Sequence, residues 1–202
     1  MNRLRRKLEY LGLANVKLLE HDAADINLPD ASVDVVASNL GINNFENADA
    51  VMQSLFRVVK PEAGLYLTTN LCGHMAEFYE VFHATLIETG QNDRLAVLED
   101  HVQHRGTIDS VSSMLDKAGF SVEDAETNSF QMRFADGSSL LRHYFIRLGF
   151  VQGWKSIVTG DLQQTTFEAL VRNLNIVASE RGELALTIPM AYFEARKYAS
   201  GQ

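Results

Sequence analysis

Apolar residues recur along the first half of the chain with two spacings that alternate. Residues 4–11 and 51–59 carry apolar side chains at helical spacing, whereas residues 16–19, 33–37 and 65–69 are short apolar runs that favour strands. The run at 33–37 (VDVVA) is typical of a strand buried on both faces. Strands that alternate with helices predict parallel βαβ units, so we expect an α/β fold.

The second half of the sequence is richer in helical patterns. Apolar stripes and capping residues predict helices at residues 75–87, 94–103, 107–118, 140–148 and 167–181. Strand patterns fall at Val122, at 130–134 and at 184–196, where Pro189 suggests an edge strand or a bulge. Fewer strands and more helices are therefore expected after residue 71.

The composition narrows the class of protein. The 202 residues fit one domain with a sizeable core, and 26 acidic against 18 basic residues give a net charge of −8. This charge repels phosphate backbones, and no apolar run reaches the roughly 20 residues of a membrane span. With a single cysteine, Cys72, neither an internal disulfide nor a cysteine-based zinc site can form. We expect a cytoplasmic protein with no nucleic-acid, membrane or metal partner.

The basic start of the chain, MNRLRRKLEYLG, is not a secretory signal, because it lacks an apolar central region. Its leucines at helical spacing favour an amphipathic helix whose basic residues face water. A mitochondrial presequence is the alternative interpretation.

Three short segments of the first half carry recognisable motifs. Residues 21–34 (HDAADINLPDASVD) match the pattern Gly-Asp-Ala-x-x-Leu-Pro-Phe-Pro-Asp-x-Ser-Phe-Asp at six positions without a gap. Residues 35–45 (VVASNLGINNF) read as a strand end and its loop, and residues 57–69 (RVVKPEAGLYLTT) follow Arg-Val-Leu-Lys-Pro-Gly-Gly, with Glu62-Ala63 replacing the glycine pair. In this order and register the segments resemble class I S-adenosylmethionine-dependent methyltransferases.

The resemblance implies a Rossmann-like fold with a mostly parallel sheet, a helical lid insertion and an antiparallel final strand. Residues 1–202 would form one domain, with the remaining cofactor-binding portion at 1–71, the helical lid region at 72–119 and C-terminal strands and helices at 120–202. The family's first strands, its Gly-x-Gly loop and the acidic residue that holds the ribose have no counterpart in the sequence. We therefore expect either native residues before Met1, or a rearrangement in which the two predicted strands at 16–19 and 33–37 pair directly or with strands of a second copy. We also expect the 202 residues alone to bind the cofactor weakly or not at all.

S-adenosylmethionine is the cofactor that the resemblance implies. It assigns the adenine amine to the Asp22 carboxylate and an adenine ring nitrogen to the backbone N–H of Ala23. Asn39 and Leu40 would lie near the methionine moiety and the reactive methyl group, because open α/β sheets bind ligands at the carboxyl ends of their strands. A turn-forming aspartate and a loop-capping asparagine are the competing interpretations of Asp22 and Asn39.

Methyl transfer from a sulfonium needs mainly alignment, and a general base only when the acceptor loses a proton. Four residues are candidates for the acceptor side of the pocket: His74, Tyr79, His143 and Tyr144. His74 is expected at the mouth of the pocket, and for each of the four an ordinary packing or surface role is the alternative. His101 and His104 are spaced i, i+3 on a predicted helix, but no further ligands accompany them that would complete a metal site.

The sequence thus predicts an enzyme that methylates a small-molecule or carrier-bound acceptor. Residues 136–150 and 186–197 are similar to malonyl-carrier O-methyltransferases of biotin synthesis, and the loop at 41–45 is similar to ubiquinone and menaquinone C-methyltransferases. The alternative is a non-catalytic methyltransferase-like partner or structural subunit, which the missing glycine loop favours. A nicotinamide-dependent oxidoreductase has no fingerprint in its favour. Oligomeric state is open, and a homodimer is one alternative.

Overall fold

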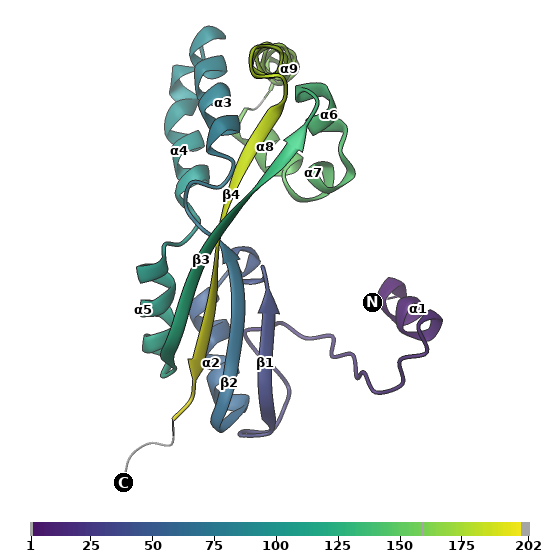
Figure 1. Ribbon diagram of the computed structural model, residues 1–202, viewed down its shortest axis with the longest axis vertical. Helices are drawn as coiled ribbons and strands as arrows, with labels where there is room; N and C mark the ends of the chain where they lie inside the picture. The colour runs from purple at the N-terminus through teal and green to yellow at the C-terminus, as the bar shows by residue number, and fades with distance from the viewer. Residues whose placement is uncertain (1, 159, 199–202) are drawn as a thin grey trace.

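The computed structural model describes residues 2–158 and 160–198. Figure 1 shows a sheet in the lower half, a group of helices above it, and two long strands that run through both halves. The elements are, in chain order, α1 (Asn2–Tyr10), β1 (Val33–Asn39), η1 (Ile42–Asn44), α2 (Ala48–Val58), β2 (Val59–Asn70), α3 (Ala76–Glu88), η2 (Asn92–Arg94), α4 (Leu95–Gln103), α5 (Ile108–Ala118), β3 (Ser121–Phe134), α6 (Gly137–Arg142), α7 (Tyr144–Gly149), α8 (Val151–Ile157), α9 (Leu162–Arg181) and β4 (Leu184–Arg196). In the described part of the chain no helix combines the length and the apolar character that a bilayer span requires.

The four strands form one mixed sheet with the order β1-β2-β4-β3. β1 and β2 are parallel, whereas β4 is antiparallel to both of its neighbours, β2 and β3. The α/β fold and the antiparallel final strand are therefore confirmed. The expectation of a mostly parallel sheet is wrong for the described residues, because β4 lies between β2 and β3 and reverses two of the three strand pairings.

Pro189 lies in this interior strand, although a proline there suggested a sheet edge. The pairing of β4 with β2 ends at Asn70↔Met190, one residue before the proline is reached, and only β3 continues beside it. The carbonyl of Pro189 accepts a hydrogen bond from the Leu71 N–H, which shows that this side of the residue faces the end of β2. The missing proline N–H thus falls where the strand has lost its second neighbour.

Two buried clusters hold the fold together. The sheet core joins α2 and α5 to the inward side chains of β2 and β4, including Met52, Leu115, Leu67 and Phe193. The helical core joins α3, α4 and the helices from α6 to α9 to the upper ends of β3 and β4, and it includes the fully buried Trp154. Because β4 contributes to both clusters, it ties the helices to the sheet.

The α5 helix begins and ends where its capping residues predict. The Thr107 side chain accepts a hydrogen bond from the Ser110 N–H at the start of α5, and Gly119 ends this helix with φ +101°. The single helix predicted at 140–148 is wrong: it is two short helices, α6 and α7, because His143 adopts an extended conformation (φ −62°, ψ 131°) between them. The α8 helix that follows was not predicted.

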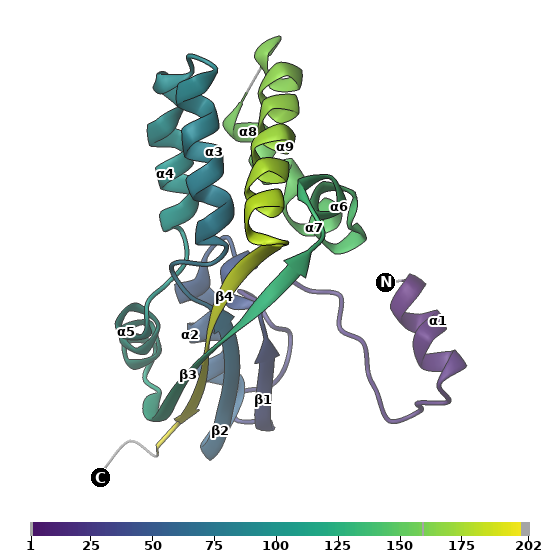
Figure 2. The ribbon, with the colours of Figure 1, turned by 45° about the horizontal axis from the view of Figure 1, so that its top comes forward.

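The segment before β1 differs most from expectation. Residues 16–19 form no strand, and Val16 and Leu19 are 45% and 39% exposed. Neither these residues nor the outer edge of β1 has a strand partner in the described residues, so direct pairing, one of the alternatives that we considered, does not occur there. β1 is also not buried on both faces, since Val35 is 57% exposed. The reason is visible in Figures 1 and 2, where α1 stands apart from the sheet at the end of an extended segment.

Candidate functional site

A cavity of about 270 Å³ lies at the carboxyl ends of β1 and β2. Its wall combines the loop after β1, the last residue of β2, the end of α4 with the residues after it, and the α7–α8 region. The lining residues are Leu40, Asn43, Asn44, Asn70, His101, His104, Arg105, Phe145, Gly149, Phe150 and Gly153. This is the edge at which open α/β sheets bind their ligands, so the cavity is the candidate site.

The loop after β1 is fixed to β2 by hydrogen bonds. The Thr68 hydroxyl donates to Asn39 Oδ1 (2.6 Å), and the Leu40 N–H donates to the Thr68 carbonyl (3.0 Å). Asn43 Nδ2 donates to the Asn70 carbonyl (2.9 Å). Leu40 has φ +57°, an uncommon conformation for a leucine, and it lines the cavity. Sequence-predicted Leu40 is therefore brought to the site, whereas Asn39 supports the loop from outside it.

A basic wall faces this loop. His101, His104 and Arg105 line it, and no aspartate or glutamate is among the lining residues. The Arg105 side chain is buried, with the residue only 9% exposed, and its Nε has no hydrogen-bond partner among the residues that the structure describes. Burial lowers the pKa of His101, and the charges of His104 and Arg105 lower this pKa further. His101 is therefore predominantly neutral at pH 7.

His74 does not line the cavity, at whose mouth we had expected it, but contacts the lining residue Phe150. The residue is 3% exposed and its ring stacks on Phe150, with 5.7 Å between ring centroids. Burial lowers the pKa of His74 from 6.5 to about 3, and Arg105 and His104 contribute in the same direction. Its Nδ1 and the Asn70 Oδ1 are buried without hydrogen-bond partners. His74 thus shapes the site from behind as a neutral ring.

The other three acceptor-side candidates do not line the cavity. Tyr79 is 5% exposed, and its hydroxyl accepts a hydrogen bond from Trp154 Nε1 (3.1 Å) in the helical core. His143 is exposed at the junction of α6 and α7, with its ring edge against Phe134, and Tyr144 is 69% exposed. The structure therefore favours the packing or surface interpretation for these residues.

Asp22 and Ala23 lie in a turn rather than after a strand. Asp22 is exposed, and its Oδ1 accepts a hydrogen bond from the Ala24 N–H (2.9 Å). Ala23 packs against the sheet core, the same cluster that contains Ile42 of the loop after β1. The geometry of Asp22 is that of a turn-forming aspartate, and its adenine-binding role stays a prediction.

Arg57 connects the first of the three motifs to the third. Its guanidinium donates to the carbonyls of Ile26 (2.5 Å) and Leu28 (2.8 Å) and to the carboxylate of Asp30 (2.7 Å). The Ile26 N–H in turn donates to the Ser54 hydroxyl on α2 (3.1 Å). The segment that carries Asp22 is thereby anchored to α2, which explains why an arginine begins the third motif.

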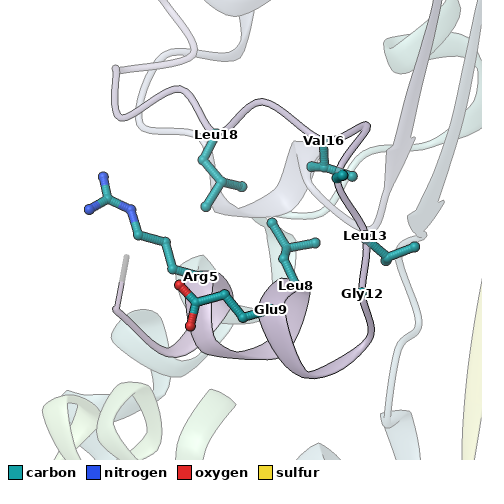
Figure 3. Close-up of a pocket in the computed structure, with 8 residues that line it drawn as sticks. Arg5, Leu8, Glu9, Gly12, Leu13, Val16 and Leu18 are labelled. Carbon is teal, nitrogen blue, oxygen red and sulfur yellow. The ribbon is translucent and has the colours of Figure 1, made fainter.

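A second cavity, of about 550 Å³, lies between α1 and the chain that follows it. Figure 3 shows that Leu8, Leu13 and Leu18 border it together with Arg5 and Glu9. All of its lining comes from residues 5–18, and none comes from the sheet. Because its lining comes from one short segment and not from the ends of the strands, this cavity is not the candidate functional site.

Several lining residues of the candidate site were missed by sequence reasoning. Asn43 belongs to a motif that had been singled out, but no role was given to it. The histidines at 101 and 104 were considered only as metal ligands, and in the described part of the chain no group of three metal-ligand side chains gathers. Arg105 gave no signal in the sequence, because its burial arises only from tertiary packing.

Comparisons with known proteins find methyltransferases among the matches. A protein-family model described as "Methyltransferase domain" matches residues 1–67. A ubiquinone/menaquinone biosynthesis C-methyltransferase of Pseudoalteromonas translucida is 25% identical over 126 residues, which cover 57% of this chain and 50% of the relative. The chain thus spans about half the length of the curated relatives it matches.

Solved structures share the fold over nearly the whole chain. A predicted methyltransferase from Bacillus halodurans C-125 superposes with a TM-score of 0.58 at 16% identity, covering 96% of this chain and 77% of the other. The [4+2]-cyclase SpnF superposes with a TM-score of 0.51 at 15% identity, covering 97% of this chain and 61% of the other. Since one of these neighbours is named a cyclase, the likeness to solved structures establishes the fold and not the reaction.

Proposed function

We propose that this chain is part of a class I S-adenosylmethionine-dependent methyltransferase, and that its native protein transfers a methyl group from S-adenosylmethionine to a small-molecule acceptor bound in the cavity at the ends of β1 and β2. The observation that carries the proposal is the position of the second motif. Its loop, residues 39–45, contributes Leu40, Asn43 and Asn44 to the cavity wall. A motif typical of the family thus lies where the fold binds ligands.

The described residues fit one part of the donor. One oxygen of the exposed Asp22 carboxylate accepts from Ala24, and the other has no hydrogen bond within the described residues, so it can accept from the adenine amine. The Gly-x-Gly sequence that the family uses does not occur in the 202 residues, so no residue is assigned to the methionine or ribose moieties. When bound, S-adenosylmethionine supplies a methyl group that is already activated by the sulfonium.

The protein's own residues act on the acceptor side. The rings of Phe145 and Phe150 offer the cavity an apolar surface that suits an aromatic acceptor. The matched relative is named for ubiquinone and menaquinone biosynthesis, which favours a quinone-type ring. His101 lines the cavity with a lowered pKa, and its neutral ring can accept a proton from the acceptor. A carrier-bound acid, suggested by the similarity of residues 136–150 and 186–197, is the second acceptor class.

A transfer assay tests the proposal. The native protein is incubated with methyl-tritiated S-adenosylmethionine and either a hydroquinone with a free ring carbon or a malonyl thioester, and label in the extracted product is counted. We expect label in the hydroquinone, and a loss of about 10²–10⁴-fold in kcat for His101→Gln if His101 is the base. His143→Gln is the matched control, because His143 is exposed and outside the cavity. Label in neither acceptor would favour the non-catalytic subunit.

A further inference from the structure

Arg105 is a buried cation to which the described residues supply no anion. The residue is 9% exposed, its Nε has no hydrogen-bond partner, and within the described residues no carboxylate forms an ion pair with its guanidinium. Its backbone is held in place, since the Arg105 carbonyl accepts a hydrogen bond from the Cys72 thiol (2.7 Å). Arginine is almost never buried unless it is paired, so this position requires an explanation.

The residues that line the cavity with Arg105 supply no counter-charge. His101 and His104 line the same cavity, His74 lies behind it, and the lining residues include no acid, although the chain has 26 acidic residues and a net charge of −8. Neither histidine nor asparagine can neutralise a guanidinium. We propose that the cavity binds the carboxylate or phosphate group of an anionic acceptor against Arg105, with the histidines as further hydrogen-bond partners.

The size of the cavity limits the ligand. A volume of about 270 Å³ equals that of about nine water molecules in the liquid, each about 30 Å³. This volume fits a small acid, or the anionic end of a longer molecule, with its apolar part against Phe145 and Phe150. The assignment of the anion to the methyl acceptor rests on the proposed function. The anion site itself rests on the burial of Arg105 and not on methyl transfer.

Calorimetry with simple probes tests the anion site. The native protein is titrated at constant ionic strength with benzoate, with its neutral analogue benzamide and with inorganic phosphate. We expect benzoate or phosphate to bind and benzamide to bind at least about tenfold more weakly, and the tighter of the two anions identifies the group. Equal affinity for benzoate and benzamide with no phosphate binding, or no binding of any probe, would overturn the proposal.

Three substitutions of arginine separate the site from general electrostatics. Arg105→Gln should lower the affinity for the anion by about tenfold to a hundredfold, and Arg105→Lys by less. Arg147→Gln makes the same change of charge at an exposed position of α7 outside the cavity lining, and should leave the affinity unchanged. Equal affinities in Arg105→Gln and Arg147→Gln, with both variants folded by circular dichroism, would contradict the assignment. Because these titrations use no methyl donor, they stand or fail independently of methyl transfer.

Discussion

Replacing Arg57 with alanine should loosen the attachment of the Asp22 segment to α2, leaving the Ile26 N–H to Ser54 hydroxyl hydrogen bond, while the sheet itself stays folded. The guanidinium holds this segment through three acceptors, the carbonyls of Ile26 and Leu28 and the carboxylate of Asp30. Alanine removes all three hydrogen bonds. The backbone hydrogen bond from the Ser32 N–H to the Val58 carbonyl remains, so the end of the segment next to β1 keeps its attachment.

The size of the effect follows from the exposure of each partner. The Arg57 and Asp30 side chains are 39% and 77% exposed, so their ion pair should contribute at most about 1 kcal/mol. The two carbonyl acceptors are partly buried, and hydrogen bonds to a charged group contribute about 1.5–3 kcal/mol each before the exposure of Arg57 is considered. We expect a loss of about 2–4 kcal/mol in the free energy of unfolding.

Urea denaturation and amide hydrogen exchange measure the two parts of this prediction. Arg57→Ala should lower the urea concentration at the unfolding midpoint and speed amide exchange at Ile26. Amide exchange at Leu67 in the sheet core should change only as far as the free energy of global unfolding changes. Lys60→Ala is the matched control, since it removes a single ion pair, the one with Asp34. The Lys60 and Asp34 side chains are 44% and 79% exposed, so this ion pair should contribute about 0–1 kcal/mol to stability. Equal losses of stability in the two variants, with unchanged amide exchange at Ile26, would show that Arg57 does not hold the segment that carries Asp22.

Three other residues give further predictions. Asp22→Ala should weaken binding of S-adenosylhomocysteine to the native protein by about tenfold to a hundredfold, measured by calorimetry, and an unchanged Kd would remove Asp22 from the site. His74 has a folded pKa of about 3 against 6.5 unfolded, so its neutral form contributes full stability above pH 6.5. That stability falls by about 1.4 kcal/mol per pH unit towards pH 3, and His74→Phe should remove this slope from urea titrations between pH 7 and 4.5. Tyr79→Phe leaves the buried Trp154 N–H without its acceptor and should lower the free energy of unfolding by about 1–3 kcal/mol. Urea unfolding followed by tryptophan fluorescence measures this loss, and an unaltered unfolding midpoint would mean that this hydrogen bond is not formed.

Elements with local signals were predictable from the sequence. The start of α5 at Thr107 and its end at Gly119 depend on hydrogen bonds between residues only a few positions apart. The capping residues that form them can be recognised in the sequence. A strand needs a partner, and residues 16–19 have none in the described structure, so their apolar pattern gave a wrong prediction. The break at His143 also had no local signal, because leucines and aromatics continue across it.

The candidate site was predictable only in outline. The resemblance of residues 35–45 placed Leu40 at the carboxyl end of β1, and the structure brings it to the cavity. Arg105 and Phe150 are far apart in sequence, and they meet at one cavity only because α4 and α8 both pack over the ends of the strands. Burial, and with it the unpaired state of Arg105, is a tertiary property that no motif records.

Donor and acceptor should meet at the carboxyl ends of β1 and β2, and a crystal structure of the native protein with S-adenosylhomocysteine and benzoate would show whether they do. We expect density for the homocysteine sulfur beside the Leu40 loop and for the benzoate carboxylate against the Arg105 guanidinium. Cofactor density on another face of the sheet, or a benzoate whose carboxylate points away from Arg105, would contradict it.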